Sequence, residues 1–231
     1  MELSEKNSNL VIKILLLCGI FSSVLYIATD ILAATFLYPG YDYTSQQVSE
    51  LSAVGAPTRT LWIAMTFVYD GLVIAFSLGV WISASKKRTL QVTSILLTMF
   101  AIIGILWAFF PMHQPGTVEV ETDIMHIVFA MVQLFVMVLF IGLGSGVRGT
   151  KFRFYSVATI IAMLLFGAIV TQQINTIAAG QSTPWMGLFE RVSVYAPEIW
   201  IIFFALMILL NKQMLHFSLI RIRNTQTITK A

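Results

Sequence analysis

"DIMHIVFAMVQLFVMVLFIGLGSG", residues 123–146, carries an aspartate and a histidine at its start and no other ionisable group. Roughly 20 apolar residues are enough to cross the ~30 Å hydrocarbon core of a bilayer as a helix. The rest of the chain is similar in character, because 58% of its 231 residues are hydrophobic and only 11% are charged, against about 25% charged in soluble domains. We therefore expect one all-α integral membrane domain over residues 1–231.

Six apolar runs are long enough to span a membrane, and short polar loops separate them. The loops include KKR (86–88), PMHQPGTVEVE (111–121), VRGTKFR (147–153) and AAGQSTPWMG (178–187). Each run must be helical in lipid, since its backbone polar groups have no other partner there. The predicted spans are residues 10–37, 60–84, 90–110, 123–146, 154–177 and 190–211, which gives a six-helix polytopic bundle.

The basic residues predict the orientation of this bundle. Twelve fall on one side of the six spans, namely Lys6, Lys13, Lys86, Lys87, Arg88, Arg148, Lys151, Arg153, Lys212, Arg221, Arg223 and Lys230. Only Arg59 and Arg191 fall on the other side. Cytoplasmic loops carry the excess of Lys and Arg, so we expect a multi-pass protein of the cell membrane with both termini in the cytoplasm.

The polar passage "TSQQVSELSAVGAPTRTLW", residues 44–62, then lies outside the cytoplasm. Thr44 and Gln47 have the spacing of a capping box, and Gly55 is a natural helix stop. The pattern predicts a short helix over 45–54 that lies on the outer interface between the first two spans.

Side chains of this passage are candidates for ligand contact. Ser49 could face a cavity or water, and Glu50 is expected in water, where acidic residues usually lie. Arg59 could pair with Glu50 or bind a lipid phosphate, for which arginine is well suited.

Ionisable residues inside the predicted spans indicate a functional site. Asp30, Asp70 and Glu198 lie within spans, where an ionised carboxylate costs ~2.5 kcal/mol or more. Their helical spacing places polar side chains in the outer half of the bundle. We expect a water-accessible cavity that opens outward, lined by Asp30, Asp70, His126, Gln172, Arg191 and Glu198. The alternative is that these residues only hold the helices together.

The expected function is the binding or handling of a lipid or other amphiphile at the outer leaflet. The candidate ligand-binding residues are Asp30, Ser49, Glu50, Arg59, Asp70, Asp123, His126, Gln172, Arg191 and Glu198. The partners are then membrane lipids, and a homo-oligomer is left open. Nucleic acid is not expected, because no basic patch is interleaved with aromatic residues.

A membrane-embedded hydrolase is the first alternative, and a structural scaffold without a ligand is the second. The candidate catalytic residues are His126, Asp70, Glu198 and Ser49, although the chain has neither an HExxH nor a GxSxG motif. His113, Asp123 and His126 would be the ligands if a metal were bound, with Asp70 or Glu198 as a fourth. No cofactor is assigned.

Three segments resemble a known family. They are YPGYDYTSQQVSELSAVGAPTRTLW (38–62), FPMHQPGTVEVETDIMHIVFAMV (110–132) and GLFERVSVYAPEIW (187–200). They resemble the DUF998 family of six-span membrane proteins, and more faintly the Frag1/DRAM/Sfk1 proteins, which are linked to lipid and membrane handling. The matching residues are Ser49, Glu50, Pro57, His126, Gly187, Arg191 and Trp200. The resemblance implies a fold and a side of the membrane, and no reaction.

Overall fold

The structure, a computed structural model, describes residues 2–114, 121–173, 176, 181 and 183–228, with side chains from residue 9 to residue 210. Throughout these ranges the chain is helical apart from connecting loops, and it forms no strand. The all-α class is therefore confirmed. Lys230 and the predicted end of the fifth span, at residue 177, lie outside the described residues.

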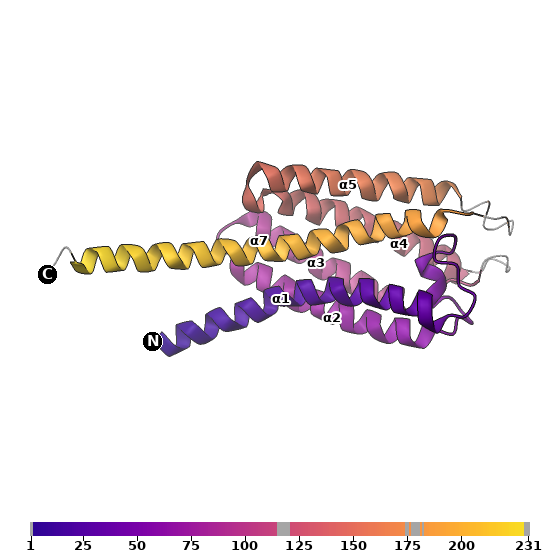
Figure 1. The fold of residues 1–231 in the computed structure, drawn as a ribbon, viewed down its shortest axis with the longest axis horizontal. Helices are drawn as coiled ribbons and strands as arrows, with labels where there is room; N and C mark the ends of the chain where they lie inside the picture. Colours follow the sequence, from indigo (N-terminus) through magenta and orange to yellow (C-terminus); the bar gives the residue numbers. More distant parts are fainter. Residues whose placement is uncertain (1, 115–120, 174–175, 177–180, 182, 229–231) are drawn as a thin grey trace.

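Long helices lie side by side in an elongated bundle (Figure 1). They are α1 (Glu2–Leu32), α2 (Arg59–Ala84), α3 (Arg88–Trp107), α4 (Glu121–Gly144), α5 (Gly149–Gln172) and α7 (Met186–Ile228). Three short elements join or extend them: the π-helical turn η1 (Ala33–Leu37) and the 3₁₀ helices η2 (Val48–Ser52) and η3 (Ser145–Arg148). The sixth span was predicted to end at residue 211, whereas α7 continues to Ile228.

Five stretches of the described chain are long and apolar enough to cross a membrane: Asn9–Leu37, Arg59–Ala84, Arg88–Trp107, Glu121–Gln172 and Met186–Leu210. The fourth, at 52 residues, contains both α4 and α5. Large apolar side chains are exposed on the outside of the bundle, among them Phe21, Phe36, Phe135 and Phe154. Such a surface suits lipid rather than water, so the chain is a helical membrane protein.

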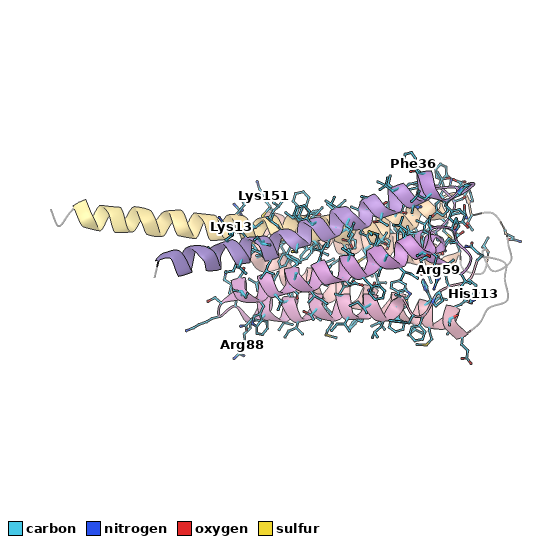
Figure 2. All side chains as sticks on the ribbon, turned by 90° about the horizontal axis from the view of Figure 1, so that it is seen from below. Lys13, Phe36, Arg59, Arg88, His113 and Lys151 are labelled. Carbon is cyan, nitrogen blue, oxygen red and sulfur yellow. The ribbon has the colours of Figure 1, made fainter. Side chains whose placement is uncertain are left out.

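The two ends of the bundle differ. We call the end that carries residues 38–58 the loop end, and the end from which α1 and α7 project the terminal end (Figure 1). In Figure 2, Lys13, Arg88 and Lys151 lie toward the terminal end, whereas Arg59 and His113 lie at the loop end.

The half toward the terminal end has a solid core of aromatic side chains. Trp200 stacks on Phe204 with ring centroids 4.6 Å apart, and Phe140 and Phe152 each lie 5.8 Å from Trp200. Gly144 makes room for this cluster, because a Cβ there would lie 2.6 Å from the Trp200 ring. Glycine at helix contacts commonly allows this kind of close packing in membranes.

The segment between α1 and α2 differs from its prediction. The expected ten-residue helix over 45–54 is only a 3₁₀ helix of five residues, Val48–Ser52. Its capping box joins Gln47 and Glu50, not Thr44 and Gln47. Thr44 instead donates to Asp42 through both its backbone N–H and its hydroxyl. Together with the Ser45 hydroxyl, the Thr44 hydroxyl lowers the pKa of Asp42 to about 2.

Glu50 was expected in water, and the structure buries it. Its carboxylate accepts hydrogen bonds from the Gln47 backbone N–H at 2.9 Å and from Gln46 Nε2 at 2.7 Å. Burial raises the pKa of Glu50, and these two hydrogen bonds oppose the rise. The Glu50 carboxylate thus stabilises the loop and does not pair with Arg59. The Nη1 of Arg59 instead donates to the Ser52 carbonyl at 2.5 Å.

Candidate functional site

The most elaborate polar contact of the bundle joins α1 to α7. Arg191 Nε donates to Asp30 Oδ2 at 2.8 Å, and its Nη2 donates to Asp30 Oδ1 at 2.9 Å. Both side chains are buried. Tyr195 also donates to Asp30 Oδ2. A two-pronged pair of this kind combines charge with fixed geometry.

Arg191 also holds the loop that follows α1. Its Nη1 donates to the carbonyls of Tyr43 and Gln46 at 2.8 and 3.2 Å, and its Nη2 donates to the Tyr41 hydroxyl at 3.0 Å. The guanidinium carbon lies 3.6 Å from the centre of the Tyr43 ring. Gly187 lets this loop approach α7, because a Cβ there would lie 2.7 Å from the Tyr43 carbonyl oxygen.

Asp30 and Arg191 were expected to line a cavity, and the structure places neither of them there. Every nitrogen of the Arg191 guanidinium donates to a protein acceptor, so none is left for a lipid phosphate. The geometry of these two residues agrees with the alternative, in which buried polar residues hold the helices together.

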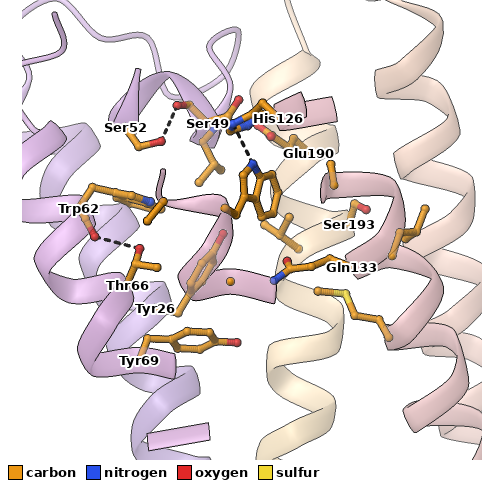
Figure 3. A pocket seen from close by; sticks show the side chains of 18 of the residues that line it. Tyr26, Ser49, Ser52, Trp62, Thr66, Tyr69, His126, Gln133, Glu190 and Ser193 are labelled. Atoms are coloured by element: carbon orange, nitrogen blue, oxygen red, sulfur yellow. Dashed lines mark hydrogen bonds between the residues drawn. The ribbon is translucent and has the colours of Figure 1, made fainter. Parts of the chain in front are cut away.

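A separate cavity of about 300 Å³ lies in the loop-end half. All six long helices contribute to its wall, α1 through Tyr26, and η2 covers it with Val48, Ser49 and Ser52. Most of the wall is apolar and includes Trp62, Phe100, Trp107 and Phe110. Figure 3 shows Ser49, His126 and Glu190 toward one end and Tyr69 and Gln133 toward the other.

Two carboxylates lie in the deep part of this cavity. Asp70 is 1% exposed, and neither of its oxygens forms a hydrogen bond with the described part of the chain. Glu198 is 3% exposed, and its Oε1 accepts a hydrogen bond from the Tyr69 hydroxyl at 2.6 Å. Its Oε2 forms no hydrogen bond of normal geometry in the same ranges, although the Ser23 hydroxyl interacts with this carboxylate. Buried polar groups are normally satisfied, so these oxygens stand out.

The shallower part of the cavity holds His126 from α4. Trp107 Nε1 donates to His126 Nδ1 at 2.8 Å, and the Phe110 carbonyl lies 3.0 Å from the same nitrogen. Only one of these contacts can be a hydrogen bond at a time, because Nδ1 either accepts or donates. The ring is therefore held in place by Trp107 or by Phe110, according to its tautomer.

The hydrolase alternative needs a connected nucleophile, base and acid, and these side chains do not form one. Ser49 Oγ donates to Gln47 Oε1 at 3.0 Å rather than to His126. Asp70 forms no hydrogen bond with described residues, and so it does not orient His126. Ser49, His126, Asp70 and Glu198 share one cavity wall without a hydrogen-bonded relay between them.

The candidate metal ligands His113, Asp123 and His126 do not converge on one point. His113 and Asp123 pair with each other, with both carboxylate oxygens 3.2 Å from His113 Nδ1. His126 contacts Trp107 instead. In the described ranges, no group of three or more His, Cys, Asp or Glu side chains is placed to hold a metal ion.

The candidate ligand-binding residues therefore fall into two groups. Ser49, Arg59, Asp70, His126 and Glu198 line the cavity. The others lie elsewhere: Asp30 and Arg191 in the buried ion pair, Glu50 in the loop, Asp123 beside His113, and Gln172 exposed near the end of α5.

Some cavity residues were not singled out from the sequence. Glu190 lines the cavity and accepts the Val48 backbone N–H at 2.5 Å, which fixes η2 to α7. Gln133 lies seven residues after His126, on the same face of α4, and this spacing was a usable signal. Tyr69 had no such signal, because its role follows from contact with Glu198, a residue far away in the chain.

The cavity reaches the outer surface of the bundle along its side. Met131 of α4 lines the cavity and is nevertheless 55% exposed. Thr171 of α5 likewise combines an exposed side chain with a place in the wall. A long apolar molecule could thus enter between α4 and α5 from the lipid side.

A family model for proteins of unknown function, DUF998, matches residues 20–207. The chain belongs to the DUF998 family. The match runs from within α1 to within α7, includes the cavity and the Asp30–Arg191 pair, and confirms the resemblance seen in the sequence. It does not address the fainter similarity to Frag1/DRAM/Sfk1 proteins. No curated protein and no solved structure is detectably similar to this DUF998 protein.

Proposed function

We propose that this DUF998 protein binds a lipid or another amphiphile in the cavity of its loop-end half. The observation that carries the proposal is a largely apolar cavity with carboxylates at depth and an exposed side at Met131. Ligand sites are typically clefts of roughly 300–1,000 Å³ with apolar walls and a few polar groups. The volume here, about 300 Å³, suits a single chain or a small amphiphile.

Arg59 is the cationic side chain in the described wall of this cavity. It lies beside Ser52 at the loop end, while Asp70 follows it by eleven residues on α2, or about 16 Å along a helix. The cavity thus offers a positive group near its roof and negative groups at depth. A polar head group can be held at either end while an apolar chain contacts the wall.

Filling the cavity tests this proposal. Ala130 lines the cavity on α4, and Ala130→Phe would place an aromatic ring in it. We expect the wild-type protein, purified in mild detergent, to retain an amphiphile class enriched over bulk membrane, and Ala130→Phe to reduce its amount about tenfold, since that corresponds to only ~1.4 kcal/mol of lost binding. Mass spectrometry of extracted lipids measures both quantities.

The matched control is Val128→Phe, which adds a ring on the same helix at an exposed position outside the cavity. It should leave the retained amphiphile unchanged. If wild type retains no enriched class, or if both variants lose it equally, the binding proposal is wrong.

We further propose that the chain crosses the cell membrane six times, with its loop end outside and both termini in the cytoplasm. Two observations support this. Helices α4 and α5 run antiparallel and are joined at the terminal end (Figure 1), so the 52-residue stretch has the length of two crossings. The excess of basic residues belongs to the terminal end, as cytoplasmic loops require.

Single cysteines test the orientation in intact cells. In a Cys18→Ser background, we expect Asp42→Cys to react with a membrane-impermeant maleimide. Lys86→Cys and Lys151→Cys should react only after the membrane is opened. All three positions are exposed. Labelling of Lys151→Cys without labelling of Lys86→Cys would contradict the six-crossing arrangement, and labelling of both without Asp42→Cys would reverse it.

A further inference from the structure

The strongest unexplained feature of the molecule is the carboxylate of Asp70. Asp70 is only 1% exposed and lines the cavity. Neither of its carboxylate oxygens has a hydrogen-bond partner among the described residues. A buried ionisable group of this kind is costly unless something pairs with it. Asp30, the other deeply buried aspartate, has its partner in Arg191, so the contrast is specific to the cavity.

Among the described residues, no cation forms an ion pair or hydrogen bond with Asp70. Arg191 is fully engaged by Asp30 and the loop. Arg59 contacts the Ser52 carbonyl near the roof. Lys13, Arg88 and Lys151 lie toward the terminal end (Figure 2). A charged carboxylate at this position would therefore need a counter-ion from outside the described protein.

The backbone beside Asp70 is shaped to admit its carboxylate. A Cβ at Gly104 of α3 would lie 2.6 and 2.7 Å from the two oxygens of Asp70. Any larger side chain there would push the carboxylate away. Gly104 also lines the cavity, so the close approach occurs at the wall itself.

A second carboxylate and several aromatic rings complete the environment. Glu198 lines the same cavity, and its carboxylate interacts with the Tyr69 and Ser23 hydroxyls. Tyr69 donates to Glu198 and lies 5.5 Å from Tyr26, centre to centre. Carboxylates together with aromatic faces are the groups that recognise organic ammonium ions. A metal ion would need further ligands, and the described residues offer no group of three.

We propose that the cavity selects a cationic amphiphile, whose ammonium group lies against Asp70 and Glu198 and whose apolar chain follows the wall toward Met131. This inference rests on the proposed binding function and narrows it to one ligand class. The ammonium supplies the positive charge and the N–H donors that the carboxylate oxygens lack. An anionic amphiphile of the same chain length would meet repulsion at the same depth.

Two probes with the same chain length and opposite charge test the inference, namely dodecylammonium and dodecanoate. The full-length protein is placed in nanodiscs, and binding is followed by the change in tryptophan fluorescence, since Trp62 and Trp107 line the cavity. Empty nanodiscs correct for partition into lipid. We expect dodecylammonium to bind at least about tenfold more tightly than dodecanoate, because a hydrogen bond to a charged group contributes ~1.5–3 kcal/mol.

Asp70→Asn removes the charge and keeps the shape. It should weaken dodecylammonium about tenfold or more and leave the unfolding temperature the same or higher, because an unpaired buried charge is lost. Asp42→Asn is the matched control, since Asp42 is exposed at the loop end and outside the cavity. It should change neither binding nor preference. Glu198→Gln provides a second variant if Asp70→Asn does not fold.

The outcomes separate this inference from the binding function itself. Equal affinity of wild type for the two probes would overturn the cationic preference and leave amphiphile binding standing. Binding of both probes that Ala130→Phe does not reduce would overturn the cavity as the site. Competition by methylammonium at the same concentration as dodecylammonium would show that the site takes a small cation, and would also overturn the inference.

Discussion

Arg191→Ala is expected to destabilise the protein by about 3–5 kcal/mol, the usual cost of leaving a buried charge without its partner. The substitution removes both guanidinium hydrogen bonds to Asp30 and leaves a fully buried carboxylate without its counter-charge. It also removes the contacts to the carbonyls of Tyr43 and Gln46. Chemical unfolding in detergent micelles, followed by tryptophan fluorescence, measures the loss.

Two further variants make this prediction specific. Arg153→Ala removes an exposed arginine from α5 and should change stability by only about 0.5 kcal/mol or less. The double variant Asp30→Ala/Arg191→Ala should lose less than the sum of the two single variants, since no unpaired charge remains. An Arg191→Ala variant no less stable than Arg153→Ala would show that the ion pair does not hold α1 to α7.

The helices were predictable because their physical cause is local. Apolar runs of about 20 residues between charged loops predicted α2, α3 and α4 to within about three residues at each end. The extension of α7 to Ile228 was not predictable in this way. Beyond residue 211 the sequence mixes basic and polar residues with apolar ones, and it lacks the continuous apolar run that predicts a membrane span.

The partners of buried polar residues were not predictable. Asp30 and Arg191 are 161 residues apart, and sequence spacing shows only that both belong to the loop-end half. The same limit explains the error at Glu50, whose burial depends on Gln46 and Gln47 folding back over it. Helical periodicity places a residue on a face, but it does not say which opposite charge lies across the interface.

The residues that carry the resemblance to the family fall partly among the helix contacts and partly in the cavity wall. Gly187 and Arg191 admit and bind the loop between α1 and α2, and Trp200 fills the solid half of the bundle. These three residues of the motif shape the scaffold. Ser49 and His126, which also belong to the matching residues, line the cavity. Asp70, whose carboxylate forms no hydrogen bond with described residues, is not among them.

Trp200→Ala is expected to destabilise the protein by about 3–5 kcal/mol, as large-to-small changes of buried aromatic residues do. Trp200 is completely buried, stacks on Phe204 and donates to Ser156 Oγ at 2.8 Å. Lipid is as apolar as the core, so the loss comes from packing and the Ser156 hydrogen bond rather than from water. Trp200→Phe should lose less, because a ring remains.

The control for this prediction is Trp81→Ala on α2, where the indole is exposed on the outside of the bundle. It removes the same side chain with little loss of internal packing, so its effect on chemical unfolding should stay below about 1 kcal/mol. Equal losses for Trp81→Ala and Trp200→Ala would mean that the aromatic cluster is not the stabilising core of the terminal half. Because the cluster lies apart from the cavity, Trp200→Phe should also keep the affinity for dodecylammonium, which Asp70→Asn loses.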